Sequence, residues 1–142
     1  MSSSLTAPGL LDTSAVIDLA DLDASSLPSE CLISAITLAE LSAGALVATN
    51  TRERAARQAH LQQAEADFDP LPFDASAART FGQVAASLRR AGRKPSARAY
   101  DIMIAATALS NGLPVYTCNP ADFSGIDGLD VVAVPVPNAP TP

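Results

Sequence analysis

Four acidic side chains lie in apolar or small-residue stretches of the sequence, where an isolated carboxylate would be costly. They are Asp12, Glu40, Asp101 and Asp122. Carboxylates that converge in a folded protein repel one another, and burying them without compensation is unfavourable. A divalent cation removes both costs, and oxygen-only ligands suit Mg²⁺ or Mn²⁺. Such an ion stabilises charge on a phosphoryl group and activates bound water, so the pattern indicates metal-assisted phosphoryl chemistry.

Each of these acids also has a purely structural interpretation. Asp12 can cap the helix that follows it, and Thr37 and Glu40 have the spacing of a capping box. Asp101 opens an apolar helix, whose dipole favours an acid, and Asp122 sits in a loop, where Asp is a common turn residue. The functional interpretation depends on all four acids meeting at one place.

The elements that would bring them together alternate between short apolar strands and helices. Pro70 and Pro72 bound a further short extended piece. The alternation predicts an α/β domain with a mainly parallel sheet, in which functional residues collect at the carboxyl ends of the strands. The expected strands lie at 10–11, 31–36 (strand or early helix), 115–117 and 131–134, and the expected helices at 15–22, 37–47, 51–68, 75–91 and 100–110.

Composition limits the class of protein. The chain has 142 residues, 48% hydrophobic and 17% charged, with a net charge of −6, which favours one folded domain and argues against a protein that coats nucleic acid. No stretch is long and apolar enough for a membrane span. Cys31, Cys118 and the single histidine, His60, are too few and too scattered for a zinc site or a disulfide framework. We expect a soluble cytoplasmic protein with reduced cysteines and a solvated histidine.

The positive charges are confined to the middle of the chain. All nine basic residues lie between positions 52 and 98, and no acid occurs from 75 to 100. Arg89 and Arg90 have a simple interpretation, because cations favour helix C-termini. The sequence just before Asp101 carries three further basic residues, Arg93, Lys94 and Arg98. We therefore predict that they form an RNA-binding rim beside the metal site.

Four segments of the chain, in order, resemble the four motifs of PIN-domain ribonucleases. Length and spacing are most similar to the VapC toxins of bacterial toxin–antitoxin pairs. The resemblance spans about residues 10–134 and implies a three-layer α/β/α fold with a mainly parallel, roughly five-stranded sheet. A short N-terminal lead precedes this domain, and a proline-rich tail, 135–142, follows it. The segments are Leu11-Asp12-Thr13-Ser14-Ala15, Thr37-Leu38-Ala39-Glu40-Leu41, Tyr100-Asp101-Ile102-Met103-Ile104-Ala105-Ala106 and Thr117-Cys118-Asn119-Pro120-Ala121-Asp122-Phe123.

The resemblance assigns roles to these residues. Asp12 and Asp101 are the principal metal ligands, Glu40 ligates the metal or orients water, and Asp122 supports a second ion. Many relatives have Asp where this chain has Asn119, which leaves open whether Asn119 or Asp122 fills the fourth position and whether one metal binds or two. The residues expected to orient the ligands by hydrogen bonds are Thr13, Ser14, Thr117 and Asn119.

The resemblance also implies a function. It is that of a toxin, a Mg²⁺-dependent (or Mn²⁺-dependent) endoribonuclease that cuts a specific transfer or ribosomal RNA, leaves a 5′-phosphate and a 3′-hydroxyl, and inhibits translation. Its expected partners are a VapB-like antitoxin, which would dock near the helices from Thr37 to Phe68, and a second copy of the chain.

Three other functions remain open at this stage. A non-catalytic PIN module would act only as an RNA- or protein-binding scaffold. A haloacid-dehalogenase-like phosphatase would need a second Asp two positions after Asp12, where this chain has Ser14. A phosphoacceptor receiver would need an acidic pair near Asp12, which this chain lacks, and the only lysine, Lys94, is misplaced before the helix at 100–110.

Overall fold

A computed structural model describes residues 7–137 of the protein. The first part of the expected N-terminal lead and the expected tail from residue 138 onward lie outside these residues. The strands are β1 (Pro8–Leu11), β2 (Glu30–Leu32), β3 (Val115–Thr117) and β4 (Val131–Ala133). The α-helices are α1 (Thr13–Ile17), α2 (Ala35–Val47), α3 (Thr51–Asp67), α4 (Ala75–Arg90) and α5 (Ala99–Ser110). Short 3-10 helices are η2 (Leu19–Asp21), η3 (Ala24–Ser26), η4 (Pro95–Arg98) and η5 (Pro120–Phe123).

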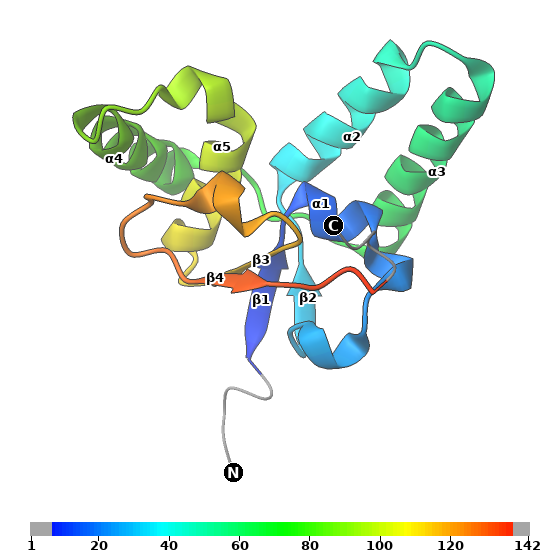
Figure 1. Cartoon of the computed structure of the whole chain (residues 1–142), viewed down its shortest axis with the longest axis horizontal. Coiled ribbons are helices and arrows are strands. Elements are labelled where there is room, and N and C mark those ends of the chain that lie inside the picture. The colour runs from blue at the N-terminus through cyan, green and yellow to red at the C-terminus, as the bar shows by residue number, and fades with distance from the viewer. Residues whose placement is uncertain (1–6, 138–142) are drawn as a thin grey trace.

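The four strands form one parallel sheet in the order β2-β1-β3-β4. The α2–α3 hairpin rises on one side of the sheet, and α4 and α5 lie on the other (Figure 1). The predicted parallel α/β architecture is therefore confirmed. Because every strand runs in the same direction, all their carboxyl ends meet at one edge, which is where the segments that carry the four acids begin.

The sheet has four strands within residues 7–137 rather than roughly five, and proline explains the difference. Leu71 makes one isolated parallel bridge next to β2, in which its N–H donates to Ile33 O at 2.9 Å and its carbonyl accepts from Ala35 N at 2.8 Å. Its neighbours Pro70 and Pro72 have no N–H to donate, so the pairing ends after one residue.

The central strand is buried on both faces. Leu10 packs into a core with Ile104 of α5, whereas the next residue, Leu11, packs into a second core with Leu41 of α2 and Leu61 of α3. Successive side chains of a strand point to opposite faces, so one short apolar strand joins the two halves of the molecule. Rigid strand packing therefore fixes the position of the residue that follows β1.

Capping side chains set the starts of the helices. Asp12 caps α1, as predicted, by accepting from Ala15 N, and Asp74 caps α4 in the same way. The predicted Thr37–Glu40 capping box is wrong, because α2 begins two residues earlier and is capped by Ser34, whose hydroxyl accepts from the first-turn amides. Glu40 is thus free of a capping role. Within residues 7–137, no helix is both long and apolar enough to cross a membrane.

Candidate active site

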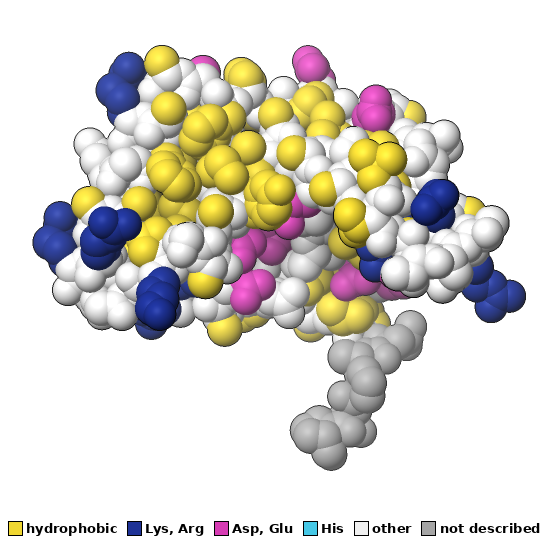
Figure 2. Space-filling view, turned by 90° about the horizontal axis from the view of Figure 1, so that it is seen from above, with side chains coloured by type: hydrophobic (Ala, Val, Ile, Leu, Met, Phe, Trp, Pro, Cys, Tyr) yellow, Lys and Arg dark blue, Asp and Glu magenta, His cyan; other side chains and the backbone are white. Residues whose placement is uncertain are grey.

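The four acids reach a common region from four elements. Asp12 follows β1, Glu40 lies in the second turn of α2, Asp101 in the first turn of α5, and Asp122 in η5. The space-filling view shows acidic side chains gathered in a hollow near the middle of one face, with basic side chains toward its outer edges (Figure 2). The four acids thus come from four separate elements, and their joint role in binding a metal stays a prediction.

Asp12 is the most rigidly held of the acids, with only 3% of its surface exposed. Its Oδ1 accepts from Ser14 Oγ at 2.7 Å and Ala15 N at 2.9 Å, and its Oδ2 accepts from Thr117 Oγ1 at 2.6 Å. Burial raises the pKa of Asp12 above its ordinary value, while these hydrogen bonds act in the opposite direction. The carboxylate is therefore fixed in place but remains electrostatically under-compensated.

The two hydroxyls around Asp12 also tie it to the loop after β3. Ser14 Oγ accepts from Cys118 N at 3.1 Å, and Thr117 Oγ1 accepts from Asn119 N at 2.9 Å. The predicted supporting roles of Ser14 and Thr117 match these contacts. Asn119 contributes its backbone amide here, and its side chain does not cap η5.

Glu40 is held by a threonine pair. Thr13 Oγ1 lies 2.6 Å from Glu40 Oε1 and 3.1 Å from Thr37 Oγ1. The Thr13 hydroxyl has one proton, and it donates this proton to Glu40 at the shorter distance, because an ionised carboxylate can only accept. Burial raises the pKa of Glu40. Sequence reasoning missed Thr37 as part of this network, although its position one turn before Glu40 on the same helix face was the available signal.

Asp101 shows most clearly how strongly the acids interact. Its pKa is raised to about 6, first by burial and then by the negative charges of Asp122, Glu40 and Asp12. Coulombic effects of this kind require the groups to be near one another. All four acids therefore belong to one electrostatic unit, and each added negative charge makes the others harder to ionise.

This unit fits a divalent cation chemically. Among the described residues, no three His, Cys, Asp or Glu side chains are yet arranged closely enough to enclose an ion. The donor set consists of carboxylates, which Mg²⁺ and Mn²⁺ prefer, and such ions commonly keep several water ligands. Burial and then mutual repulsion raise the pKa of Asp12, Glu40 and Asp101, and a cation placed among these acids would offset both. The roles of Asp12, Asp101, Glu40 and Asp122 as metal ligands stay a prediction.

The predicted RNA-binding rim lies next to this unit. Lys94 and Arg93 are exposed and Arg98 is half-buried. Both arginines donate to the carbonyl of Ser124, just beyond η5, at 3.3 Å. Contact with RNA by Arg93, Lys94 and Arg98 stays a prediction.

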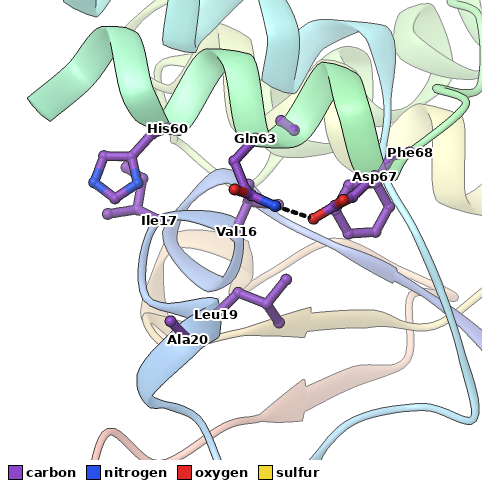
Figure 3. Close-up of a pocket in the computed structure, with 9 residues that line it drawn as sticks. Val16, Ile17, Leu19, Ala20, His60, Gln63, Asp67 and Phe68 are labelled. Atoms are coloured by element: carbon purple, nitrogen blue, oxygen red, sulfur yellow. Dashed lines mark hydrogen bonds between the residues drawn. The ribbon is translucent and has the colours of Figure 1, made fainter. Parts of the chain in front are cut away.

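Two hollows lie along α1 and α3. One, of about 390 Å³, is lined by Val16, Ile17, His60 and Phe68, among others (Figure 3). A second, of about 260 Å³, shares Ile17 and His60 and reaches Glu40. His60 therefore lies, partly exposed, at the junction of the two hollows. The Ile17 side chain, 43% exposed, lies at the same junction.

Known proteins of similar sequence and structure form a consistent group. The sequence matches the PIN domain family over residues 9–129. It is 38% identical over 135 residues to Ribonuclease VapC5 of Mycobacterium tuberculosis, covering 93% of this chain and 97% of that protein. It is 38% identical over 97 residues to the tRNA(fMet)-specific endonuclease VapC of Shigella flexneri, covering 68% and 70%. The crystal structure of VapBC-5 from M. tuberculosis, a member of the VapBC family of toxin–antitoxin systems, superimposes with a TM-score of 0.79 at 40% identity, covering 90% of this chain and 99% of that one.

Proposed function

This chain belongs to the PIN-domain family, among its VapC ribonucleases, and from that premise we propose that it is the toxin of a VapBC pair. It would act in the cytoplasm as a Mg²⁺-dependent endoribonuclease that cuts a specific transfer or ribosomal RNA and so inhibits translation. The observation that carries this proposal is the set of neighbouring carboxylates at the carboxyl edge of the sheet, where burial and then the charges of the other acids raise the pKa of Asp101 to about 6. In a scaffold that only binds RNA, burying neighbouring carboxylates would cost folding free energy without contributing to RNA binding.

The residues divide the work between them. A bound Mg²⁺ would offset negative charge on the phosphodiester and lower the pKa of water. Asp12, fixed by three hydrogen bonds, and Asp101 would hold the ion. Glu40, whose Oε1 is bound to Thr13, would present Oε2 to the attacking water and accept its proton. Attack at phosphorus with departure of the 3′-oxygen leaves a 5′-phosphate and a 3′-hydroxyl.

The RNA would approach over the basic rim formed by Arg93, Lys94 and Arg98. Phosphate contacts position a nucleic acid without reading its sequence, so this rim would contribute affinity and salt dependence.

Removing the metal should stop cleavage. The protein incubated with total RNA and Mg²⁺ should generate a defined set of new 5′ ends, and EDTA should abolish them because the ion supplies the main stabilisation of transition-state charge. Mapping 5′ ends with and without EDTA is the measurement. The same Mg²⁺ should raise the free energy of unfolding by about 2.7 kcal/mol at a concentration 100-fold above its dissociation constant.

Two outcomes would contradict the proposal. Equal cleavage in EDTA would mean a metal-independent nuclease. RNA binding without cleavage, in a protein that Mg²⁺ does not stabilise, would favour the non-catalytic scaffold.

The hollows along α1 and α3 are our candidate docking site for the antitoxin. The M. tuberculosis neighbour is a toxin–antitoxin complex. In this chain the exposed Ile17 sits between the two hollows, one of which reaches Glu40. An apolar antitoxin segment placed there would bury Ile17 and cover the acids. We also propose that the toxin forms a homodimer.

Replacing Ile17 by Asp should weaken antitoxin binding at least about tenfold, because burying an isoleucine side chain is worth about 1.5–3 kcal/mol. Calorimetry with the VapB-like antitoxin encoded beside the toxin gene is the measurement, and the nuclease activity of the free variant should be unchanged. Leu46→Asp is the matched control, since Leu46 is 80% exposed and lies outside both hollows. Equal loss of affinity in both variants would place the antitoxin elsewhere.

A further inference from the structure

The turn that carries Asp122 is tied to two arginines that lie about thirty residues earlier in the chain. Arg93 Nη1 donates to the carbonyl of Ser124 at 3.3 Å and to its Oγ at 3.1 Å. Arg98 Nη1 donates to the same carbonyl at 3.3 Å. Two cations thus share one backbone acceptor immediately after η5. Hydrogen bonds from a charged donor are stronger than neutral ones, so these contacts restrain the turn.

The next residue is shaped to receive one of the arginines. Gly125 has a φ of +82°, which side-chain-bearing residues rarely adopt. A Cβ built at Gly125 would lie 3.3 Å from Arg93 Cζ and 3.4 Å from its Nε. The guanidinium therefore lies closely against bare backbone, and the glycine leaves the room that this packing needs.

The turn needs such a restraint because its acid is repelled by the others. After burial, the negative charge of Asp122 contributes to the raised pKa of Asp101 and of Asp12, so like charges oppose the approach of the exposed Asp122 to the unit. Phe123, fully buried, anchors the backbone of η5 but does not offset this charge. Arg98 lowers the pKa of Asp101, which places its positive charge within range of the acids.

Arg98 is also poorly placed to serve only as an RNA contact. Its Nη2 is buried and has no hydrogen-bond partner among the described residues. A buried donor without a partner is costly, and it cannot reach a phosphate unless the side chain moves. The hydrogen bond from its Nη1 to the Ser124 carbonyl ties the same side chain to the turn.

We propose that Arg93 and Arg98 are positioning residues that clamp Ser124 and so hold Asp122 against the repulsion of the other acids, in reach of the metal. This inference rests on the proposed function in one respect, namely that Asp122 contributes to metal binding. The restraint of the turn can be measured in the absence of any metal.

The test compares the Arg93→Met/Arg98→Met double variant with wild type and with Arg89→Met. Arg89 is exposed in the last turn of α4 and makes no hydrogen bond to the turn among the described residues, so it controls for loss of positive charge. The first readout is hydrogen exchange at two backbone amides in the metal-free protein. The Asp122 N–H donates to Asn119 O, and the Ser124 N–H donates to Ala121 O. The second is the dissociation constant for Mn²⁺ by calorimetry. The third is binding of a non-cleaved RNA in EDTA.

In the double variant we expect exchange at these two amides to rise at least about tenfold and the Mn²⁺ dissociation constant to rise several-fold, with neither change in Arg89→Met. Unchanged exchange and unchanged Mn²⁺ affinity would overturn the inference, and a loss of RNA binding alone would make these arginines simple phosphate contacts. A wild type that binds no Mn²⁺ would refute the proposed function instead, while the exchange measurement would still decide whether the clamp exists.

Discussion

Replacing Asp101 by Asn should abolish metal-dependent RNA cleavage and also make the metal-free protein more stable at neutral pH. Loss of a metal-ligating carboxylate removes several kcal/mol of transition-state stabilisation, so we expect a fall in rate of about 10³-fold or more. The gain in stability follows from the raised pKa of Asp101, about 6, which shows that folding disfavours its ionised form. Asn fills the same space without a charge.

The contribution of Asp101 to folding stability depends on pH. The pKa of Asp101 rises from 3.8 in the unfolded chain to about 6 in the folded protein, so between these values the folded state binds more protons. Folding stability contributed by this group is therefore highest below pH 3.8, falls as the pH rises through 6, and stays reduced above it. Since Asp101 is partly exposed, solvent screening lowers the penalty to about 1–2 kcal/mol at pH 7.5.

Chemical denaturation of wild type and Asp101→Asn in EDTA, from pH 4 to 8, measures this directly. The variant should be more stable at pH 7.5, and its advantage should shrink toward pH 4. Added Mg²⁺ should stabilise wild type more than the variant and so narrow or reverse the difference. Asp69→Asn is the control, because Asp69 lies in the α3–α4 connection, outside the acidic unit. A variant that cleaves RNA at the wild-type rate would remove Asp101 from the site.

Local patterns predicted most of the fold because local interactions determine most of its elements. The end of α3 and the start of α4 were predicted within a residue, and Asp74 caps α4 as expected. The predictions failed where tertiary contacts decide. The segment predicted as a helix over 15–22 is a short α1 followed by the 3-10 helix η2, and Ser34 takes the cap that Thr37 was expected to provide.

The candidate site was predictable for a different reason. Acids in apolar surroundings are conspicuous in a sequence, and a parallel sheet brings the ends of its strands together. What surrounds them was less visible. The Thr37–Thr13–Glu40 network needs α1 to pack on α2, and the contacts of Arg93 with Ser124 join residues 31 positions apart. No pattern within one segment reports such a contact.

Asp12 should respond to substitution in two distinct ways, because it combines a structural and a chemical role. Asp12→Ala removes the N-cap of α1 and leaves the Ser14 and Thr117 hydroxyls and Ala15 N without their acceptor in a buried place. We expect this variant to lose about 2–4 kcal/mol of folding free energy and all metal-dependent cleavage.

Asp12→Asn separates the two roles. Its Oδ1 can still accept from Ser14 and Ala15, and its new N–H can donate to Thr117 Oγ1 once that hydroxyl turns its proton away. We therefore expect its stability to stay within about 1 kcal/mol of wild type, while cleavage and Mn²⁺ binding fall as sharply as in Asp12→Ala. Urea denaturation and calorimetry measure both. Full cleavage by Asp12→Asn would leave Asp12 only its capping role and would assign the metal to the other three acids. Equal destabilisation of both variants would mean that the negative charge of Asp12 itself holds the surrounding hydroxyls in place.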